Sequence, residues 1–131
     1  MSKNTVKDVS PEKALELAKK GALFIDVREP HEVARKAFDI PDVLELPMSK
    51  FGRRYQEIPT DKKVIIACDA GNRSVMAARM LMHHGYTNIV NMQHGMINWE
   101  RSGLPVKGKV KENGGNGGGF GSLLDIFRRR G

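Results

Sequence analysis

Short apolar runs alternate along the chain with longer mixed segments that begin and end at residues typical of helix ends, such as Ser10, Gly21 and Gly85. The runs predict buried strands at residues 23–27, 43–46, 64–67 and 88–91. The mixed segments predict helices at residues 12–20, 29–35, 49–57, 74–84 and 95–102. This alternation is typical of an α/β fold with a mainly parallel sheet, in which ligands bind beyond the carboxyl ends of the strands.

The composition changes after residue 106. Residues 107–121 are crowded with glycine among polar residues, which predicts a flexible linker. Residues 122–131 place four apolar side chains at helical spacing before three arginines. We expect this basic amphipathic tail to be disordered, with docking on a partner or on an anionic membrane surface as the alternative. The predicted organisation is a domain at residues 1–106, a linker at 107–121 and a tail at 122–131.

Charge and cysteine content limit the classes of function. The formal net charge is +7, and the six basic and two acidic residues from Lys107 onward carry +4 of it. Charges of both signs are mixed in the rest of the chain, without a basic-aromatic motif, which argues against nucleic acid as a partner. No secretory leader or membrane-spanning run is evident, and the single cysteine rules out an internal disulfide. We therefore expect a reducing, cytoplasmic location.

The only cysteine stands at the most informative position in the chain. Cys68 ends the apolar run 64–67, and a six-residue loop leads from it to Arg73 and to a helix that opens at Ser74. Gly71 and Asn72 allow the unusual backbone angles by which loop amides turn inward. Inward amides and a helix N-terminus both stabilise an anion. The loop therefore favours the thiolate of Cys68, which is the nucleophilic form of cysteine.

Several interpretations of this region compete. A lone cysteine more often packs as a small apolar side chain, but the Gly-x-Arg-Ser sequence behind this one favours a nucleophile. Arg73 either closes the ring around the sulfur with positive charge, or holds the loop through a buried carboxylate such as Asp26. Arg28, just beyond the same strand as Asp26, either attracts an anionic donor into the pocket or pairs with Glu29 or Glu32.

Four segments, taken together, resemble a single-domain rhodanese, the sulfurtransferase family. They are Phe-Ile-Asp-Val-Arg-Glu at 24–29, Ile-Pro at 40–41 before Leu-Pro at 46–47, Cys68 with Gly-Asn-Arg-Ser at 71–74, and Gly95 with Trp99 before Gly-Leu-Pro-Val at 103–106. The resemblance covers about residues 5–106. It implies a rhodanese-like α/β fold, with a five-stranded, mainly parallel sheet and helices on both faces.

The resemblance also implies a persulfide intermediate. Cys68 would take the outer sulfur from a small sulfur-containing anion, such as thiosulfate, or from a protein persulfide, and would pass it to cyanide or a thiol. The charge of the persulfide would be held by the loop residues Asp69, Ala70, Gly71, Asn72, Arg73 and Ser74. No metal or organic cofactor is required. Related phosphatases and arsenate reductases carry one more residue between cysteine and arginine, so the shorter loop favours a single sulfur atom over a tetrahedral oxyanion.

The sequence departs from the family pattern at three places. Asp69 stands where many members have a basic or hydroxyl side chain, and its charge repels an anionic donor, so we expect weaker binding of thiosulfate. Ala37-Phe38-Asp39 replaces the usual Gly-His, and His94 replaces the first glycine of a Gly-Gly pair. Two alternatives to an enzyme follow: a persulfide carrier or interaction module with little thiosulfate activity, and a regulatory binding domain in which Cys68 does no chemistry.

Overall fold

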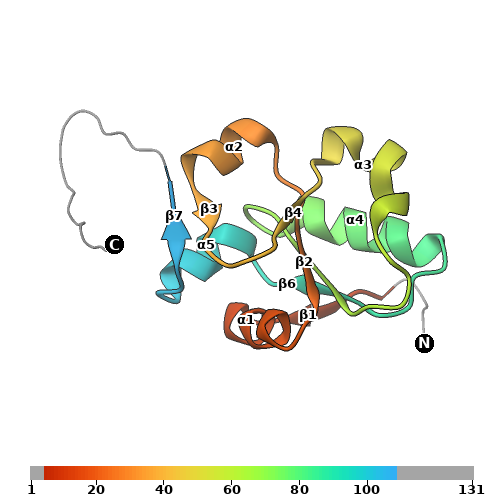
Figure 1. Cartoon of the computed structure of the whole chain (residues 1–131), viewed down its shortest axis with the longest axis horizontal. Helices are drawn as coiled ribbons and strands as arrows, with labels where there is room; N and C mark the ends of the chain where they lie inside the picture. Colours follow the sequence, from red (N-terminus) through yellow and green to blue (C-terminus); the bar gives the residue numbers. More distant parts are fainter. Residues whose placement is uncertain (1–4, 109–131) are drawn as a thin grey trace.

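Five parallel strands form the central sheet of the computed structural model, which describes residues 5–108 (Figure 1). Their order across the sheet is β1 (Lys7–Val9), β6 (Ile89–Met92), β5 (Val64–Ala67), β2 (Leu23–Asp26) and β4 (Leu44–Glu45). In the register of the sheet, Ile66 of β5 lies between Ile25 of β2 and Asn91 of β6. The expected five-stranded, mainly parallel sheet is confirmed.

Helices cover both faces of this sheet, as expected. On one face α1 (Pro11–Lys19) packs beside α5 (Gly95–Arg101), and on the other α3 (Met48–Arg54) packs beside α4 (Asn72–His83). The short helix α2 (Pro30–Arg35) follows β2, and a 3-10 turn, η1 (Tyr55–Glu57), extends α3. Because side chains alternate along a strand, Val64 and Ile66 face α4, whereas Ile65 and Ala67 face α1 and α5.

Burial on both faces explains why β5 is apolar throughout, and why its apolar run predicts it correctly. Three other strands are missed by the sequence prediction: β1, β3 (Ala37–Phe38) and β7 (Val106–Lys107). The last two pair with each other in an antiparallel ladder. Each missed strand has only two or three residues, so no alternation or apolar run can develop in it.

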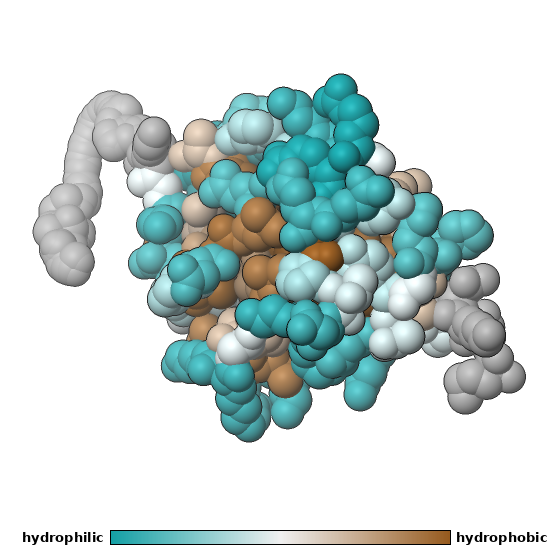
Figure 2. Space-filling model, turned by 45° about the vertical axis from the view of Figure 1, so that its right-hand side comes forward, coloured by the Kyte–Doolittle hydropathy of each residue, from teal (hydrophilic) through white to brown (hydrophobic). Residues whose placement is uncertain are grey.

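Few large apolar side chains are exposed on the described part of the chain. Among residues 5–108, Met76 and Ile97 are the large apolar side chains that remain exposed. Figure 2 shows apolar surface in the middle of one face, with hydrophilic surface around it. No helix within the described ranges is both long and apolar enough to cross a membrane. The predicted tail, and the predicted linker from residue 109 onward, lie outside the described residues.

Candidate active site

Cys68 lies at the carboxyl end of β5, where the chain turns into α4. Gly71 adopts a φ of +104°, and α4 begins at the next residue, Asn72. This turn directs the Gly71 amide at the sulfur, which accepts its hydrogen bond at 3.0 Å. The sulfur also lies 3.3 Å from the Ser74 hydroxyl. The Cys68 side chain is buried.

The remaining loop residues differ in their exposure and in their contact with the sulfur. Asp69 is half-buried, and Ala70 and Asn72 are exposed. Within the described part of the chain, Gly71 is the loop residue whose amide hydrogen-bonds the sulfur. The N-terminus of α4, a helix of 12 residues, also faces this position. One amide and a helix dipole therefore favour negative charge at Cys68.

The start of α5 supports the loop from behind. The Met96 amide donates to the Cys68 carbonyl at 2.8 Å, and the Ile97 amide donates to the Asp69 carbonyl at 3.1 Å. Gly95 makes this close approach possible, because a Cβ atom there would collide with both of these carbonyl groups. Two successive left-handed residues, His94 and Gly95, bring α5 into this position.

Arg73 is held by an acid that the sequence did not assign to it. Its guanidinium makes a two-point contact with Glu32 of α2, with Nη1–Oε1 at 2.7 Å and Nη2–Oε2 at 2.8 Å. This contact lowers the pKa of Glu32 from 4.5 to about 2 and raises the pKa of Arg73 above its usual range. The pairing of Arg73 with Asp26 considered from the sequence is wrong. Instead, Arg73 ties the loop to α2.

Asp26 and Arg28 form a buried ion pair of their own at the end of β2. Arg28 Nη2 lies 2.8 Å from Asp26 Oδ2, and its Nε and backbone amide each lie 3.0 Å from Oδ1. The guanidinium also lies over the Phe38 ring, 5.1 Å from its centre. The pairing of Arg28 with Glu29 or Glu32 considered from the sequence is wrong, because Arg28 pairs with Asp26, which neutralises its charge.

A cavity beside the loop carries both signs of charge. Three basic side chains, three acidic side chains and two apolar ones line it: Arg28, Arg35, Lys36, Glu32, Asp69, Glu100, Met96 and Ile97. Lys36 pairs with Glu100 at 2.6 Å, so part of the basic charge is also neutralised. The cavity therefore exerts little net electrostatic attraction on a small anion.

Comparison with known proteins identifies the fold family. Residues 10–102 match the family model described as Rhodanese-like domain. The chain belongs to the rhodanese-like domain family. This agrees with the resemblance found in the sequence.

Named relatives of this rhodanese-like domain include sulfurtransferases. It is 44% identical, over 64% of its length and 77% of the relative's, to a protein of Allochromatium vinosum named "Sulfurtransferase". It is 33% identical, over 79% and 94% of the two chains, to thiosulfate sulfurtransferase GlpE of Actinobacillus pleuropneumoniae. A crystal structure of a rhodanese-related protein from Thermoplasma volcanium matches with a TM-score of 0.69 and 30% identity, over 77% and 97% of the chains. These relatives support sulfurtransferase chemistry in general.

Sequence reasoning missed Asn91 and Asp8 of the rhodanese-like site, and it considered Glu32 only as a partner of Arg28. The Ser74 hydroxyl hydrogen-bonds Asn91 Oδ1, and Asn91 Nδ2 donates to Asp8 Oδ1 at 2.9 Å. Asn91 had a usable signal, since it is a polar residue within the apolar strand β6. Asp8 had none, because β1 is short and mostly exposed. Among residues 5–108, no group of three metal-ligating side chains is placed to hold a metal ion.

The pair between Glu32 and Arg73 predicts a pH-dependent contribution to stability. The pKa of Glu32 is lower in the folded protein than its ordinary value of 4.5, so its contribution is complete above that value and disappears as the pH falls through about 2. We expect Glu32→Gln to lower the free energy of unfolding by about 2 kcal/mol at neutral pH, after allowance for partial exposure. The difference from the wild type should shrink steadily in acid.

Urea unfolding of both proteins across this pH range measures the difference. Glu57→Gln serves as the matched control, because it breaks a similar two-point contact with Arg54 that is open to solvent. A difference between Glu32→Gln and the wild type that is the same in acid as at neutral pH would contradict the prediction.

Proposed function

We propose that this protein is a sulfurtransferase that moves sulfane sulfur from a donor to a thiophilic acceptor through a persulfide on Cys68. The observation that carries the proposal is the position of the Cys68 sulfur at the start of α4, 3.0 Å from the Gly71 amide. This position stabilises negative charge both on the attacking Cys68 thiolate and on the outer sulfur of the persulfide that forms. The sulfurtransferases among the relatives support the same class of reaction.

With thiosulfate as donor, the proposed reaction has two balanced steps. The Cys68 thiolate attacks the outer sulfur, a new S–S bond forms, and the bond to the sulfonate sulfur breaks. Sulfite leaves with the electron pair, and Cys68 carries a persulfide anion. Cyanide or a thiolate then attacks the outer sulfur of the persulfide, which yields thiocyanate or a new persulfide and restores the Cys68 thiolate. The outer sulfur extends about 2 Å beyond the Cys68 sulfur.

Intact-mass measurement tests this function directly. The full chain is incubated with thiosulfate, and separately with a cysteine desulfurase and cysteine. We expect thiosulfate to add one sulfur atom, and cyanide to remove it with release of thiocyanate. Absence of added sulfur with every donor would overturn the proposal. Addition from the desulfurase alone would support the carrier function instead.

The persulfide carrier is a second candidate, favoured by the charges beside Cys68. Asp69 follows the cysteine directly, and the neighbouring cavity mixes acidic with basic side chains. A small dianion such as thiosulfate gains little net attraction from such a surface. A protein donor binds through a larger interface, in which charges of both signs can find partners.

We predict that Asp69→Arg improves the use of thiosulfate. Because the substitution replaces a repelling charge with an attracting one, the KM for thiosulfate should fall by about threefold to tenfold at low ionic strength, with a smaller change in kcat. The effect should weaken in high salt. Steady-state kinetics measure it, with Asp61→Arg, in an exposed turn away from Cys68, as the control for an equal change of net charge. An unchanged KM would show that Asp69 does not influence donor binding.

A further inference from the structure

The polar side chains of Asp8 and Asn91, on the neighbouring strands β1 and β6, meet on the face of the sheet that α4 covers. Asp8 of β1 is the register partner of Asn91 of β6, and Ile66 of β5 is the partner of Asn91 on the other side. Since side chains alternate along a strand, Cys68 points to the same face as Ile66 and Asn91. Asn91 is buried, whereas Asp8 is exposed.

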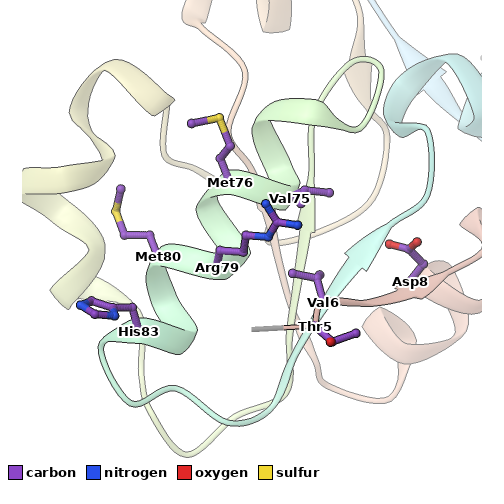
Figure 3. A pocket seen from close by; sticks show the side chains of 8 residues that line it. All are labelled: Thr5, Val6, Asp8, Val75, Met76, Arg79, Met80 and His83. Atoms are coloured by element: carbon purple, nitrogen blue, oxygen red, sulfur yellow. The ribbon is translucent and has the colours of Figure 1, made fainter. Parts of the chain in front are cut away.

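These residues form one continuous chain of hydrogen bonds with Ser74 of α4. Asp8 Oδ1 accepts from Asn91 Nδ2 at 2.9 Å, Asn91 Oδ1 accepts from the Ser74 hydroxyl, and Ser74 Oγ lies 3.3 Å from the Cys68 sulfur. Figure 3 shows Asp8 at one end of the groove between β1 and α4, at the end where Val75 also lies. These hydrogen bonds, called the relay below, therefore run from the Asp8 carboxylate at the surface to the buried sulfur of Cys68.

Chemistry fixes the direction of each hydrogen bond. An ionised carboxylate only accepts, so Asp8 turns the amino group of Asn91 toward itself and the amide oxygen of Asn91 toward Ser74. That oxygen also only accepts, so the single hydroxyl proton of Ser74 is used there. The Gly71 carbonyl, 3.2 Å from Ser74 Oγ, is another acceptor and leaves this conclusion unchanged. Ser74 therefore presents a lone pair to the sulfur.

We propose that Asp8 and Asn91 are positioning residues that turn the Ser74 hydroxyl away from the sulfur and thereby favour the thiol over the thiolate of Cys68. A thiol can donate to the Ser74 lone pair, whereas a thiolate needs a donor. The Gly71 amide remains a donor to the sulfur in either form. Ser74 can add a second hydrogen bond to the thiolate only if it gives up Asn91, or if Asn91 turns its amide oxygen toward the Asp8 carboxylate. The role in sulfur transfer rests on the proposed function, but the hydrogen-bond relay does not.

Other charges near Cys68 act on it through space. Asp69 and Arg73 belong to the loop, Glu32 of α2 binds Arg73, and the Asp26–Arg28 pair ends β2. The titratable His94 lies before α5, with its backbone against Gly71. All of these stay unchanged when only Asp8 is substituted. The negative charge of Asp8 itself also acts through space, and that effect does not depend on Ser74.

A double-mutant cycle separates the relay from the direct charge effect. We expect Asp8→Ala to raise the rate of alkylation of Cys68 by iodoacetamide at neutral pH by about fivefold, the change that one ordinary hydrogen bond produces. The ultraviolet absorbance of the thiolate, followed across neutral pH, should show a larger thiolate fraction in this variant. Asp8→Glu should keep the wild-type rate. In a Ser74→Ala background, Asp8→Ala should have a much smaller effect, because only the direct charge effect of Asp8 remains.

Two outcomes would overturn the relay. An equal acceleration in both backgrounds would assign the effect to the charge of Asp8 alone, and an unchanged or slower rate would show that Asp8 does not hold Ser74. Lys7→Ala, on the same strand with its side chain toward the other face, controls for changes in β1. Asp8→Asn, of nearly equal size, provides a second variant and should also accelerate alkylation. These measurements require no sulfur donor, so failure of persulfide formation would overturn the proposed function without affecting the relay.

Discussion

Replacing Cys68 with serine is expected to abolish persulfide formation and to lower the rate of sulfur transfer by at least about a thousandfold. A hydroxyl at this position ionises far less readily than a thiol and cannot form the disulfide-like bond of a persulfide. The substitution keeps the size of the side chain, and the Gly71 amide and Ser74 hydroxyl remain as hydrogen-bond partners for the new hydroxyl. Loss of activity would therefore report on chemistry rather than on the fold.

Two measurements on the Cys68→Ser variant check this expectation: the rate of thiocyanate formation from thiosulfate and cyanide, and the intact mass after exposure to a donor. The chain contains one cysteine, so the variant has no other thiol to carry the sulfur. A variant that still gained one sulfur atom would contradict the assignment of Cys68. Urea unfolding provides the control, with a free energy of unfolding expected within about 2 kcal/mol of the wild type.

The sequence predicts the centre of this fold better than its edges. β2, β5 and β6 are buried on nearly all positions, and each produces a recognisable apolar run. β1 lies at the edge of the sheet and reads Lys-Asp-Val, with two exposed positions. Its place in the sheet is set by pairing with β6, a contact between segments more than 80 positions apart. Such pairing leaves no signature in a three-residue segment.

In the candidate site, too, the sequence predicts some features and not others. The loop at residues 68–74 is continuous in sequence, so its glycine, arginine and serine could be interpreted together. The ion pairs could not be predicted in this way, because Arg73 binds Glu32, which lies 41 positions earlier in the chain. Arg28 instead binds Asp26, only two positions away, because the chain leaves β2 between them and lets the guanidinium fold back. Matching arginines with acids requires the tertiary arrangement of β2, α2 and α4.

Gly95→Ala is expected to lower the free energy of unfolding by about 3–5 kcal/mol and to impair sulfur transfer in the molecules that remain folded. A methyl group on Gly95 would lie inside contact distance of the Cys68 and Asp69 carbonyl groups, and both are backbone atoms that cannot rotate away. To relieve the collision, α5 and the loop must separate. That separation breaks the amide hydrogen bonds from Met96 and Ile97 and displaces the Cys68 sulfur from the Gly71 amide.

Gly103→Ala separates this collision from backbone strain. Gly103 has a φ of +77°, in the same left-handed region as the +54° of Gly95, but open space surrounds it. The alanine there should therefore cost only the left-handed strain, about 1–2 kcal/mol, and should leave the transfer rate unchanged. Urea unfolding and the thiocyanate assay on both variants measure the difference. Equal losses of stability would mean that the contact between α5 and the loop is not what Gly95 protects, since strain alone would then account for both substitutions.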